Sequence, residues 1–504
     1  MKLSKANLAS IPESEFLKKF SYDLDNVTVS IVHFGPSNFA RAHLAVYCDD
    51  LISQGHTDCG IIAVSPKIQS GTIERRDTLK EQDFLYTVVE RGKNNSHARI
   101  IGSMKDLMVG PENPKAVIDL MASPEIKLVS MTITQNGYYY SPGKGFDLDH
   151  PDIRESLENS DQPRATVAYI VKALEQRRNA GLPPFAVMSC DNIQHNSDNL
   201  KNTVLAYAGT ISNDLKHWIA DNTVFYNTMV DRIVPQLDPQ NIAEVSNQYG
   251  IEDNWPLFTE HFKQLVIETK HGPDGLPPFD KAGAQFVENV APYDEAKIRL
   301  LNGLHMALGV VGRLTGETYA DQALQRDDLR DFAKGYLAEA RETLAPLDGF
   351  DYEEYAEKLF ERVENPYMKD ELQRLARNGT EKKDSRFLSS LIDAYNNDTD
   401  RAHMVTALAA WVKYVGLSNP DPKIAEDGPN GFCISDPRAY ETGVADIARN
   451  LNGDIRSIFA IRGIFRGLEN NPSFVKELSE AWSDLGGLGA RRDPGPSQSG
   501  PNIN

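Results

Sequence analysis

The stretch Val27-Thr-Val-Ser-Ile-Val-His-Phe34, followed directly by Gly35, decides the fold of the first half of this chain. Its β-branched and aromatic side chains predict a buried strand, and the glycine permits a sharp turn where that strand ends. An amphipathic helix is predicted next, at residues 39–51. A strand, a glycine turn and a helix in this order are typical of the first unit of a dinucleotide-binding sheet.

Outward from this stretch, residues 1–285 alternate between strand and helix patterns. Further strands are predicted at residues 60–65, 84–89, 98–101, 127–134, 185–189 and 223–230, with a helix at 164–180. We therefore expect an α/β domain whose mostly parallel sheet is covered on both faces. Sheets of this kind bind ligands at the carboxyl ends of their strands.

Helical periodicity dominates after about residue 285. Helices are predicted at residues 294–312, 327–341, 352–362, 369–377, 387–396, 402–414, 440–451 and 457–467. A chain of 504 residues is too long for a single core. We therefore expect an α/β domain at 1–285, an all-α domain at 286–490 and a flexible tail at 491–504.

Bulk composition narrows the class of partner. The net charge of −19 argues against nucleic acid or an anionic membrane surface. The four cysteines are scattered without CxxC spacing, so we expect reduced thiols and neither a disulfide framework nor a zinc site. No apolar run resembles a secretory signal or a membrane span, and we expect a cytoplasmic protein with no membrane partner.

The strongest chemical signal is Lys297-x4-Asn302-x2-His305. At about 100° per residue, Asn302 lies about 140° from Lys297 around an α-helix and His305 about 80°, so all three can face one cleft. A desolvated lysine can lose its proton, an amide can donate to a developing alkoxide, and a histidine can hold the reacting oxygen. The set suits proton and hydride transfer between an alcohol and a ketone without a metal. The alternative is three solvated or capping residues.

Two strand ends carry weaker cofactor signals. Only Gly35 survives of the G-x-G-x-x-G pattern, with Ser37 in place of the second glycine, and an ordinary turn is the alternative. The next strand ends in Ser65 and Lys67, where an acid would favour NAD. A hydroxyl and a lysine suit a 2′-phosphate, although a solvated basic loop is the alternative, so NADP stays open.

Four further polar residues are candidates for the substrate site. Asn192 follows a strand and either donates to the substrate oxygen or forms a turn. Asp231 either orients a ligand or pairs with Arg232. Arg374 and Lys382 either bind hydroxyls or a carboxylate, or belong to a solvated basic face.

Taken together, the motifs resemble those of the polyol-specific long-chain dehydrogenase family. The resemblance covers roughly residues 25–480 and follows the family's order of motifs. Those motifs are Ile31-Val-His-Phe-Gly35 with Arg41-Ala-His43, Gln82-Asp-Phe-Leu-Tyr-Thr87, Met188-Ser-Cys-Asp-Asn192, Met229-Val-Asp-Arg-Ile-Val-Pro235, Gly283-Ala-Gln-Phe-Val287 and Lys297-x4-Asn302-x2-His305. The resemblance implies an α/β N-terminal Rossmann-type domain, an all-α C-terminal domain, and an active site in the cleft between them.

The resemblance also implies zinc-independent oxidation of a secondary alcohol, with no metal ligand. Lys297 would be the general base, and His305 would hydrogen-bond the reacting oxygen. The oxyanion hole would be Asn192 and Asn302. The substrate pocket would be lined by Asp231, Arg374 and Lys382. NAD would be held by Gly35, Ser37, Asn38, Phe39, Arg41, Ser65 and Lys67.

Three departures from the family pattern affect these roles. Ser37 and Ala40 replace a glycine and a histidine in the cofactor turn. Gln135 replaces a glutamate after the central strand, so a carboxylate is lost. Asp294 replaces a glutamate that passes protons to solvent, and its side chain has a shorter reach.

The expected function is that of an NAD(P)-dependent polyol dehydrogenase that interconverts D-mannitol and D-fructose as a monomer, the usual state of the family. The first alternative is a reductase of a hexuronate such as fructuronate, whose carboxylate Arg374 or Lys382 could bind. The second is a sugar or nucleotide sensor that kept the fold and lost activity, which Gln135 and the altered turn motivate.

Overall fold

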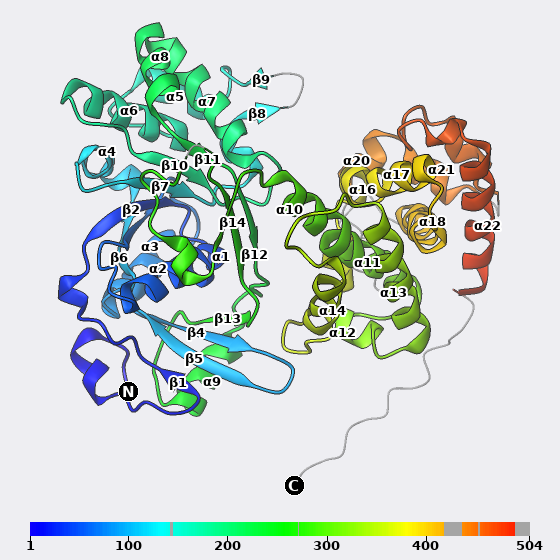
Figure 1. Cartoon of the computed structure of the whole chain (residues 1–504), viewed down its shortest axis with the longest axis horizontal. Coiled ribbons are helices and arrows are strands. Elements are labelled where there is room, and N and C mark those ends of the chain that lie inside the picture. Colours follow the sequence, from blue (N-terminus) through cyan, green and yellow to red (C-terminus); the bar gives the residue numbers. More distant parts are fainter. Residues whose placement is uncertain (142–144, 271, 418–435, 452–453, 489–504) are drawn as a thin grey trace. The chain divides into compact units, whose positions relative to one another are not determined.

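The structure is a computed structural model that describes residues 1–141, 145–270, 272–417, 436–451 and 454–488 (Figure 1). The chain divides into two compact units, Met1–Tyr293 and Asp294–Asn504. The boundary at residue 285 stays a prediction of where two folding domains meet. Cys433 and the tail predicted at 491–504 lie outside the described residues.

The core of the first unit is a six-stranded sheet in which every neighbouring pair is parallel. The strand order is β11-β10-β7-β2-β3-β6, so the sheet grows outward in both directions from β2 and β7. This is the strand order of the doubly wound Rossmann fold, and it confirms the predicted α/β class. The strands are β2 (Val29–Phe34), β3 (Gly60–Ser65), β6 (Met104–Val109), β7 (Leu128–Met131), β10 (Ala186–Ser189) and β11 (Phe225–Tyr226).

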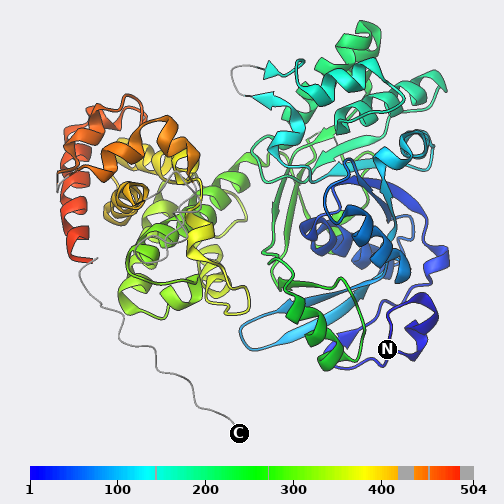
Figure 2. The same ribbon diagram turned by 180° about the vertical axis from the view of Figure 1, so that it is seen from behind.

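Helices cover both faces of this sheet (Figure 1, and Figure 2 from behind). On one face, Ile31 of β2 packs in a core that includes Leu51 of α2 (Leu44–Ser53). On the other face, Val32 of the same strand packs in a core with Ile170 of α6 (Thr166–Asn179). That second face is also covered by α4 (Pro114–Ala122) and α7 (Asn196–Ile211). Because β2 is buried on both faces, its sequence is a nearly continuous apolar run.

Two smaller sheets complete the first unit. One has the order β1-β5-β4-β13, and the other has the order β12-β14-β15. The pair predicted at residues 84–89 and 98–101 is confirmed as an antiparallel β4–β5 ladder. These strands are β1 (Leu17–Lys18), β4 (Tyr86–Arg91), β5 (Ser96–Ile101), β12 (Thr228–Asp231), β13 (Leu257–Glu260), β14 (Gln264–Glu268) and β15 (Gln285–Val287).

Two predictions for this unit were wrong in detail, and one strand of the central sheet was missed. The strand predicted at 223–230 is split between β11 and β12, because the side chain of Asn227 leaves the ladder and accepts hydrogen bonds from Ser197 N and Asp198 N. The helix predicted at 39–51 breaks at His43, so that α1 (Asn38–Ala42) ends before α2 begins. Strand β6 was missed, since its sequence has Lys105 and Asp106 in place of a continuous apolar run.

The described residues of the second unit contain helices and no extended strand, which confirms the all-α prediction. Its two most buried helices are α11 (Gly303–Leu314) and α18 (Ala402–Gly416), which share one core (Figure 1). The others that surround this core are α13 (Asp327–Glu342), α14 (Tyr352–Val363), α15 (Leu372–Ala376), α16 (Gly379–Lys383), α17 (Ser389–Asn397), α20 (Pro437–Glu441), α21 (Val444–Arg449) and α22 (Pro472–Leu488).

Three helices predicted for this unit were also wrong in detail. The helix expected at 440–451 is interrupted at Gly443, which has φ +73° and separates α20 from α21. The helix expected at 457–467 is a 3₁₀ turn, Ile455–Ala460. The helix expected at 369–377 is reduced to α15, because Lys369 adopts φ +45° and the segment before the helix is extended.

A substitution at Gly35 tests whether close packing against Thr132 constrains the turn that ends β2. It adopts φ +89°, and a Cβ atom there would lie 2.1 Å from the carbonyl oxygen of Thr132. Gly55 has a similar φ of +97° but no atom within 4 Å of its Cβ position, so it is the matched control. We expect Gly35→Ala to lower the free energy of unfolding by about 1–3 kcal/mol more than Gly55→Ala, as measured by urea denaturation. Equal losses in the two variants would show that the contact with Thr132 does not constrain the turn.

Candidate active site

Lys297 and Asn302 lie on a π-helical turn, Lys297–Asn302, that joins α10 (Ala291–Ala296) to α11. The amide of Gly303 bonds the carbonyl of Ile298, five residues earlier, as a π turn requires. Residues five apart are neighbours on such a turn, so the separation of about 140° calculated for Lys297 and Asn302 on an α-helix was wrong. A turn whose hydrogen bonds span five residues brings backbone positions five apart closer around the helix axis than an α-helix does.

The three side chains of this segment are held at different depths. Lys297 is 5% exposed and His305, one turn into α11, is 7% exposed, whereas Asn302 is half-buried. The pKa of His305 is lowered to about 4, mainly by burial; the charge of Asp370 opposes this shift, and the charges of Arg362, Arg374 and Arg386 add to it. The imidazole is therefore neutral at pH 7, with one donor and one acceptor nitrogen. Its Nε2 has no hydrogen-bond partner among the described residues, which leaves a buried polar atom for a ligand to satisfy.

Asp294 lies three residues before Lys297, on the last turn of α10. Burial raises the pKa of its carboxyl to about 7, and the positive charge of Lys297 opposes that rise. The carboxyl therefore gains and loses a proton near neutral pH. The shorter side chain noted in the sequence thus sits in an environment suited to proton exchange.

The two predicted substrate cations are not equivalent, and only Arg374 is close enough to His305 for its charge to lower the pKa of that imidazole. Arg374 is largely exposed and forms an ion pair with Asp370. Lys382, on α16, is half-buried and donates from Nζ to the carbonyl of Arg377 at 2.6 Å. Burial lowers the pKa of Lys382 to about 8, and the charges of Arg386 and Arg377 contribute to the same shift.

Sequence reasoning missed Arg386, which stands on a second π turn, Asp384–Leu388. Its Nη1 donates to the carbonyl of Asn302 at 3.4 Å. The residue stands four positions after Lys382, and this i, i+4 spacing could have identified it in a helical reading.

In the first unit, the ends of β2 and β7 meet at the predicted cofactor turn. Thr132 Oγ1 donates to the carbonyl of Gly35 at 2.8 Å and lies 3.1 Å from Ser37 Oγ. Ser37 also caps α1 by accepting from the amide of Ala40 at 3.1 Å. These neighbouring strands are where the order of the sheet reverses, which is the place where doubly wound sheets bind dinucleotides. The glycine turn at this point fits an NAD phosphate group.

The other predicted cofactor residues fall into three environments. Asn38 and Phe39 are half-buried on the first turn of α1. Arg41 is 1% exposed, and its guanidinium lies against the rings of Tyr86 and Trp255, so its contact with the cofactor stays a prediction. At the end of β3, Ser65 Oγ donates to the carbonyl of Lys67, and Lys67 Nζ lies 2.5 Å from the carboxylate of Asp152.

The two remaining predicted residues follow different sheets of the first unit. Asn192 is exposed just after β10. It follows Asp191, a buried carboxylate that accepts from the amide of Thr134 at 2.8 Å and from the hydroxyl of Tyr138 at 2.8 Å. Asp231 is 5% exposed at the end of β12, in the three-stranded sheet. Its neighbour Arg232 forms an ion pair with Glu90.

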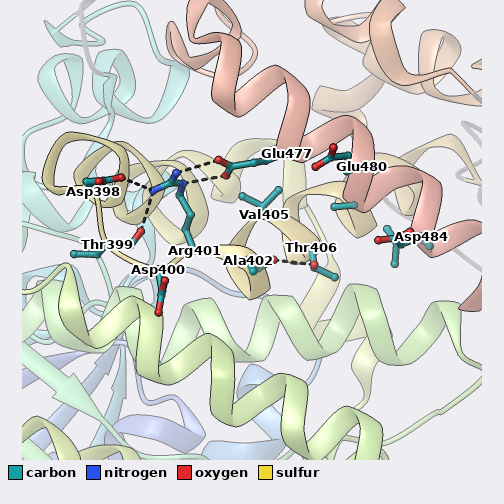
Figure 3. A pocket seen from close by; sticks show the side chains of 12 residues that line it. Asp398, Thr399, Asp400, Arg401, Ala402, Val405, Thr406, Glu477, Glu480 and Asp484 are labelled. Atoms are coloured by element: carbon teal, nitrogen blue, oxygen red, sulfur yellow. Dashed lines mark hydrogen bonds and ion pairs between the residues drawn. The ribbon is translucent and has the colours of Figure 1, made fainter.

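A pocket of about 610 Å³ in the second unit contains none of these residues (Figure 3). It lies beside α18 and α22, where Arg401 bonds both carboxylate oxygens of Glu477 at 3.0 Å. Among the described residues, no three histidine, cysteine or acidic side chains are grouped to hold a metal ion. No helix within the described ranges is long and apolar enough to cross a membrane.

A doubly wound sheet with a glycine turn, followed by an all-α unit that carries a buried lysine, an amide and a neutral histidine, defines a dinucleotide-dependent dehydrogenase. The chain belongs to the mannitol dehydrogenase family. Residues 29–281 match the mannitol dehydrogenase Rossmann domain, and residues 289–486 match the mannitol dehydrogenase C-terminal domain. The predicted family and fold are confirmed.

Individual relatives agree over nearly the whole chain. A mannitol 2-dehydrogenase of Phaeosphaeria nodorum is 36% identical over 498 residues, which cover 97% of this chain and 84% of that protein. The structure of a D-sorbitol dehydrogenase has a TM-score of 0.87 at 30% identity and covers 96% of this chain and 97% of its own. A Pseudomonas fluorescens mannitol 2-dehydrogenase, in a ternary complex with NAD and D-mannitol, has a TM-score of 0.80 at 32% identity, over 97% of this chain and 98% of its own. These similarities support oxidoreduction between a polyol and a ketose with NAD.

The raised pKa of Asp294 predicts a pH-dependent effect on stability. Between about pH 4 and pH 7 the folded protein holds a proton on Asp294 that the unfolded chain releases, so this group lowers stability as the pH rises. Asp294→Asn has no ionisable group at this position, so its stability does not fall for this reason as the pH rises. The urea midpoint of the variant, relative to wild type, should therefore rise from pH 5 to pH 8, whereas the exposed-site control Asp331→Asn should show no such trend. A constant offset for Asp294→Asn across this range would contradict the assigned environment.

Proposed function

We propose that this protein is an NAD-dependent, zinc-independent polyol dehydrogenase that interconverts D-mannitol and D-fructose. The single observation that carries the proposal is the buried Lys297 on a π turn with Asn302, beside a neutral His305 whose Nε2 has no partner among the described residues. Membership of the mannitol dehydrogenase family supports the substrate class.

Lys297 is the proposed general base. Burial disfavours its ammonium form, so a neutral amine can take the proton of the substrate hydroxyl. NAD, when bound, supplies the acceptor for the hydride that leaves the same carbon. Asp294 is close enough for its pKa to respond to Lys297, and its own pKa of about 7 suits the return of that proton to solvent. Oxidation should therefore become faster as the pH rises.

The amides and His305 are the proposed stabilisers of the reacting oxygen. Asn302 donates from the π turn, and Asn192 is the proposed second donor. Each amide should lower the barrier by about 3 kcal/mol, by analogy with the loss of an oxyanion-hole donor. His305 fixes the oxygen through a neutral ring nitrogen. Arg374, Lys382 and Asp231 are the proposed contacts to the remaining hydroxyls.

The environment of Lys67 favours NAD over NADP in this proposal. A 2′-phosphate at the end of β3 would need a free cation, but Lys67 Nζ is already bonded to the carboxylate of Asp152. Gly35, Ser37, Asn38 and Phe39 are the proposed cofactor contacts of the first turn. The protein is proposed to act as a cytoplasmic monomer, and its three described cysteines are buried thiols without disulfides.

Replacement of the base gives the sharpest kinetic test. Lys297→Ala should lower kcat for mannitol oxidation by several orders of magnitude, because the group proposed to take the hydroxyl proton is removed. NADH affinity, measured by fluorescence titration, should stay within about twofold. Lys334→Ala, at an exposed lysine of α13, is the control and should keep wild-type turnover. Turnover of Lys297→Ala close to wild type would refute the assignment of the base.

A substrate panel separates the proposal from its two alternatives. Mannitol and fructose should give the highest kcat/KM with NAD(H), ahead of mannonate and fructuronate, when NADH absorbance is followed with both cofactors in parallel. Preference for the hexuronate pair would instead establish the reductase alternative, in which Lys382 or Arg374 binds a carboxylate. No absorbance change with any member of the panel would favour the non-catalytic sensor.

A further inference from the structure

Arg386 is a half-buried cation that the proposed mechanism does not use. In the described part of the chain, no carboxylate forms an ion pair with it, although Arg374 and Lys383 nearby are each paired with an aspartate. Its side chain donates a hydrogen bond from Nη1 to the carbonyl of Asn302 at 3.4 Å. A desolvated guanidinium with so few partners is costly, so a role beyond folding has to be sought for it.

The contacts around Arg386 tie two π turns together. Tyr336, which is fully buried on α13, donates from its hydroxyl to the backbone carbonyl of Arg386 at 3.0 Å. A Cβ atom on Gly303 would lie 2.4 Å from that hydroxyl and 3.1 Å from the same carbonyl. The turn that ends in Asn302 is therefore packed against the turn that carries Arg386, with no room between them for a methyl group.

The charge of Arg386 also acts on Lys382. The charged groups that affect Lys382 are Arg386, Arg377, Glu381 and Arg374, and Lys382 in turn acts on Asp436, the N-cap of α20. Among these groups, Arg386 has the largest charge effect on Lys382 and is second only to burial. Because Arg386 forms no ion pair with a carboxylate in the described part of the chain, no direct partner cancels its effect on Lys382.

We propose that Arg386 is a positioning residue: its guanidinium holds the carbonyl of Asn302, and thereby the π turn with Lys297, and places a positive charge four residues after Lys382. The proposal deepens the dehydrogenase function and rests on it. Two separable properties follow. The planar guanidinium fixes the position of the Asn302 carbonyl, whereas its charge adds to the effect of burial on Lys382.

Direct titration of Lys382 tests the charge without any substrate. Competitive labelling of the full-length protein with acetic anhydride between pH 6 and pH 10, read by peptide mass spectrometry, should give Lys382 a pKa of about 8. In Arg386→Gln this pKa should rise, because a like charge is removed. In Arg386→Lys it should stay near the wild-type value. A pKa that does not move in Arg386→Gln would overturn the electrostatic part of the proposal, whatever the activity of the enzyme.

Steady-state kinetics test the geometric part. With mannitol as substrate, Arg386→Lys should lower kcat about tenfold or more with NADH affinity within about twofold of wild type. Arg377→Gln, which removes a nearby exposed cation that does not contact Asn302, should keep kcat within about twofold. If Arg386→Gln fails to fold, Tyr336→Phe, which removes the bond to the Arg386 carbonyl, should lower kcat in the same way. Equal kcat in Arg386→Lys, Tyr336→Phe and wild type would overturn the positioning role. A lower melting temperature with unchanged kcat would likewise overturn it, because Arg386 would then only stabilise the fold.

Discussion

The π turn Lys297–Asn302 is the constraint on which the proposed chemistry depends. An α-helix would direct Lys297 and Asn302 to well-separated sides, whereas hydrogen bonds that span five residues make them neighbours. A wider turn is less stable on its own, so it needs support from outside the helix. That support comes from the second π turn, through Tyr336 and Arg386, which close on Gly303 and the carbonyl of Asn302.

The two units differ in how their buried polar and ionisable groups are held. In the Rossmann unit, buried polar groups are tied down: Asp191 is fixed by backbone amides and Tyr138, and Gly35 by Thr132. In the helical unit, two buried or half-buried groups have pKa values close to neutral pH. Burial brings the pKa of Asp294 to about 7, and burial with neighbouring cations brings that of Lys382 to about 8. Groups whose pKa values are shifted toward neutral pH are typical of sites that move protons.

The sequence was sufficient for features that depend on simple periodicity. The buried run of β2 and its closing Gly35 predicted the parallel sheet, and the amphipathic patterns of α13, α14 and α18 predicted the helical unit. Features that depend on distant partners were missed. The helix breaks at His43, whose ring bonds the carbonyl of Gln264, a residue far away in the sequence. The two π turns pack against each other although they are about 85 residues apart in the chain. The candidate site residues were chosen by type and resemblance and stay predictions, and the position of the Arg41 guanidinium against the rings of Tyr86 and Trp255 could not be read from the sequence.

The central claim is that the neutral amine of Lys297 removes the hydroxyl proton while Asn302 of the same π turn holds the oxygen. A crystal structure of the protein with NAD and D-mannitol tests it most directly. The account predicts that Lys297 Nζ and an amide nitrogen of Asn302 lie within about 3.2 Å of the same hydroxyl oxygen, with the π turn retained. A bound polyol whose reacting hydroxyl contacts neither side chain would contradict it.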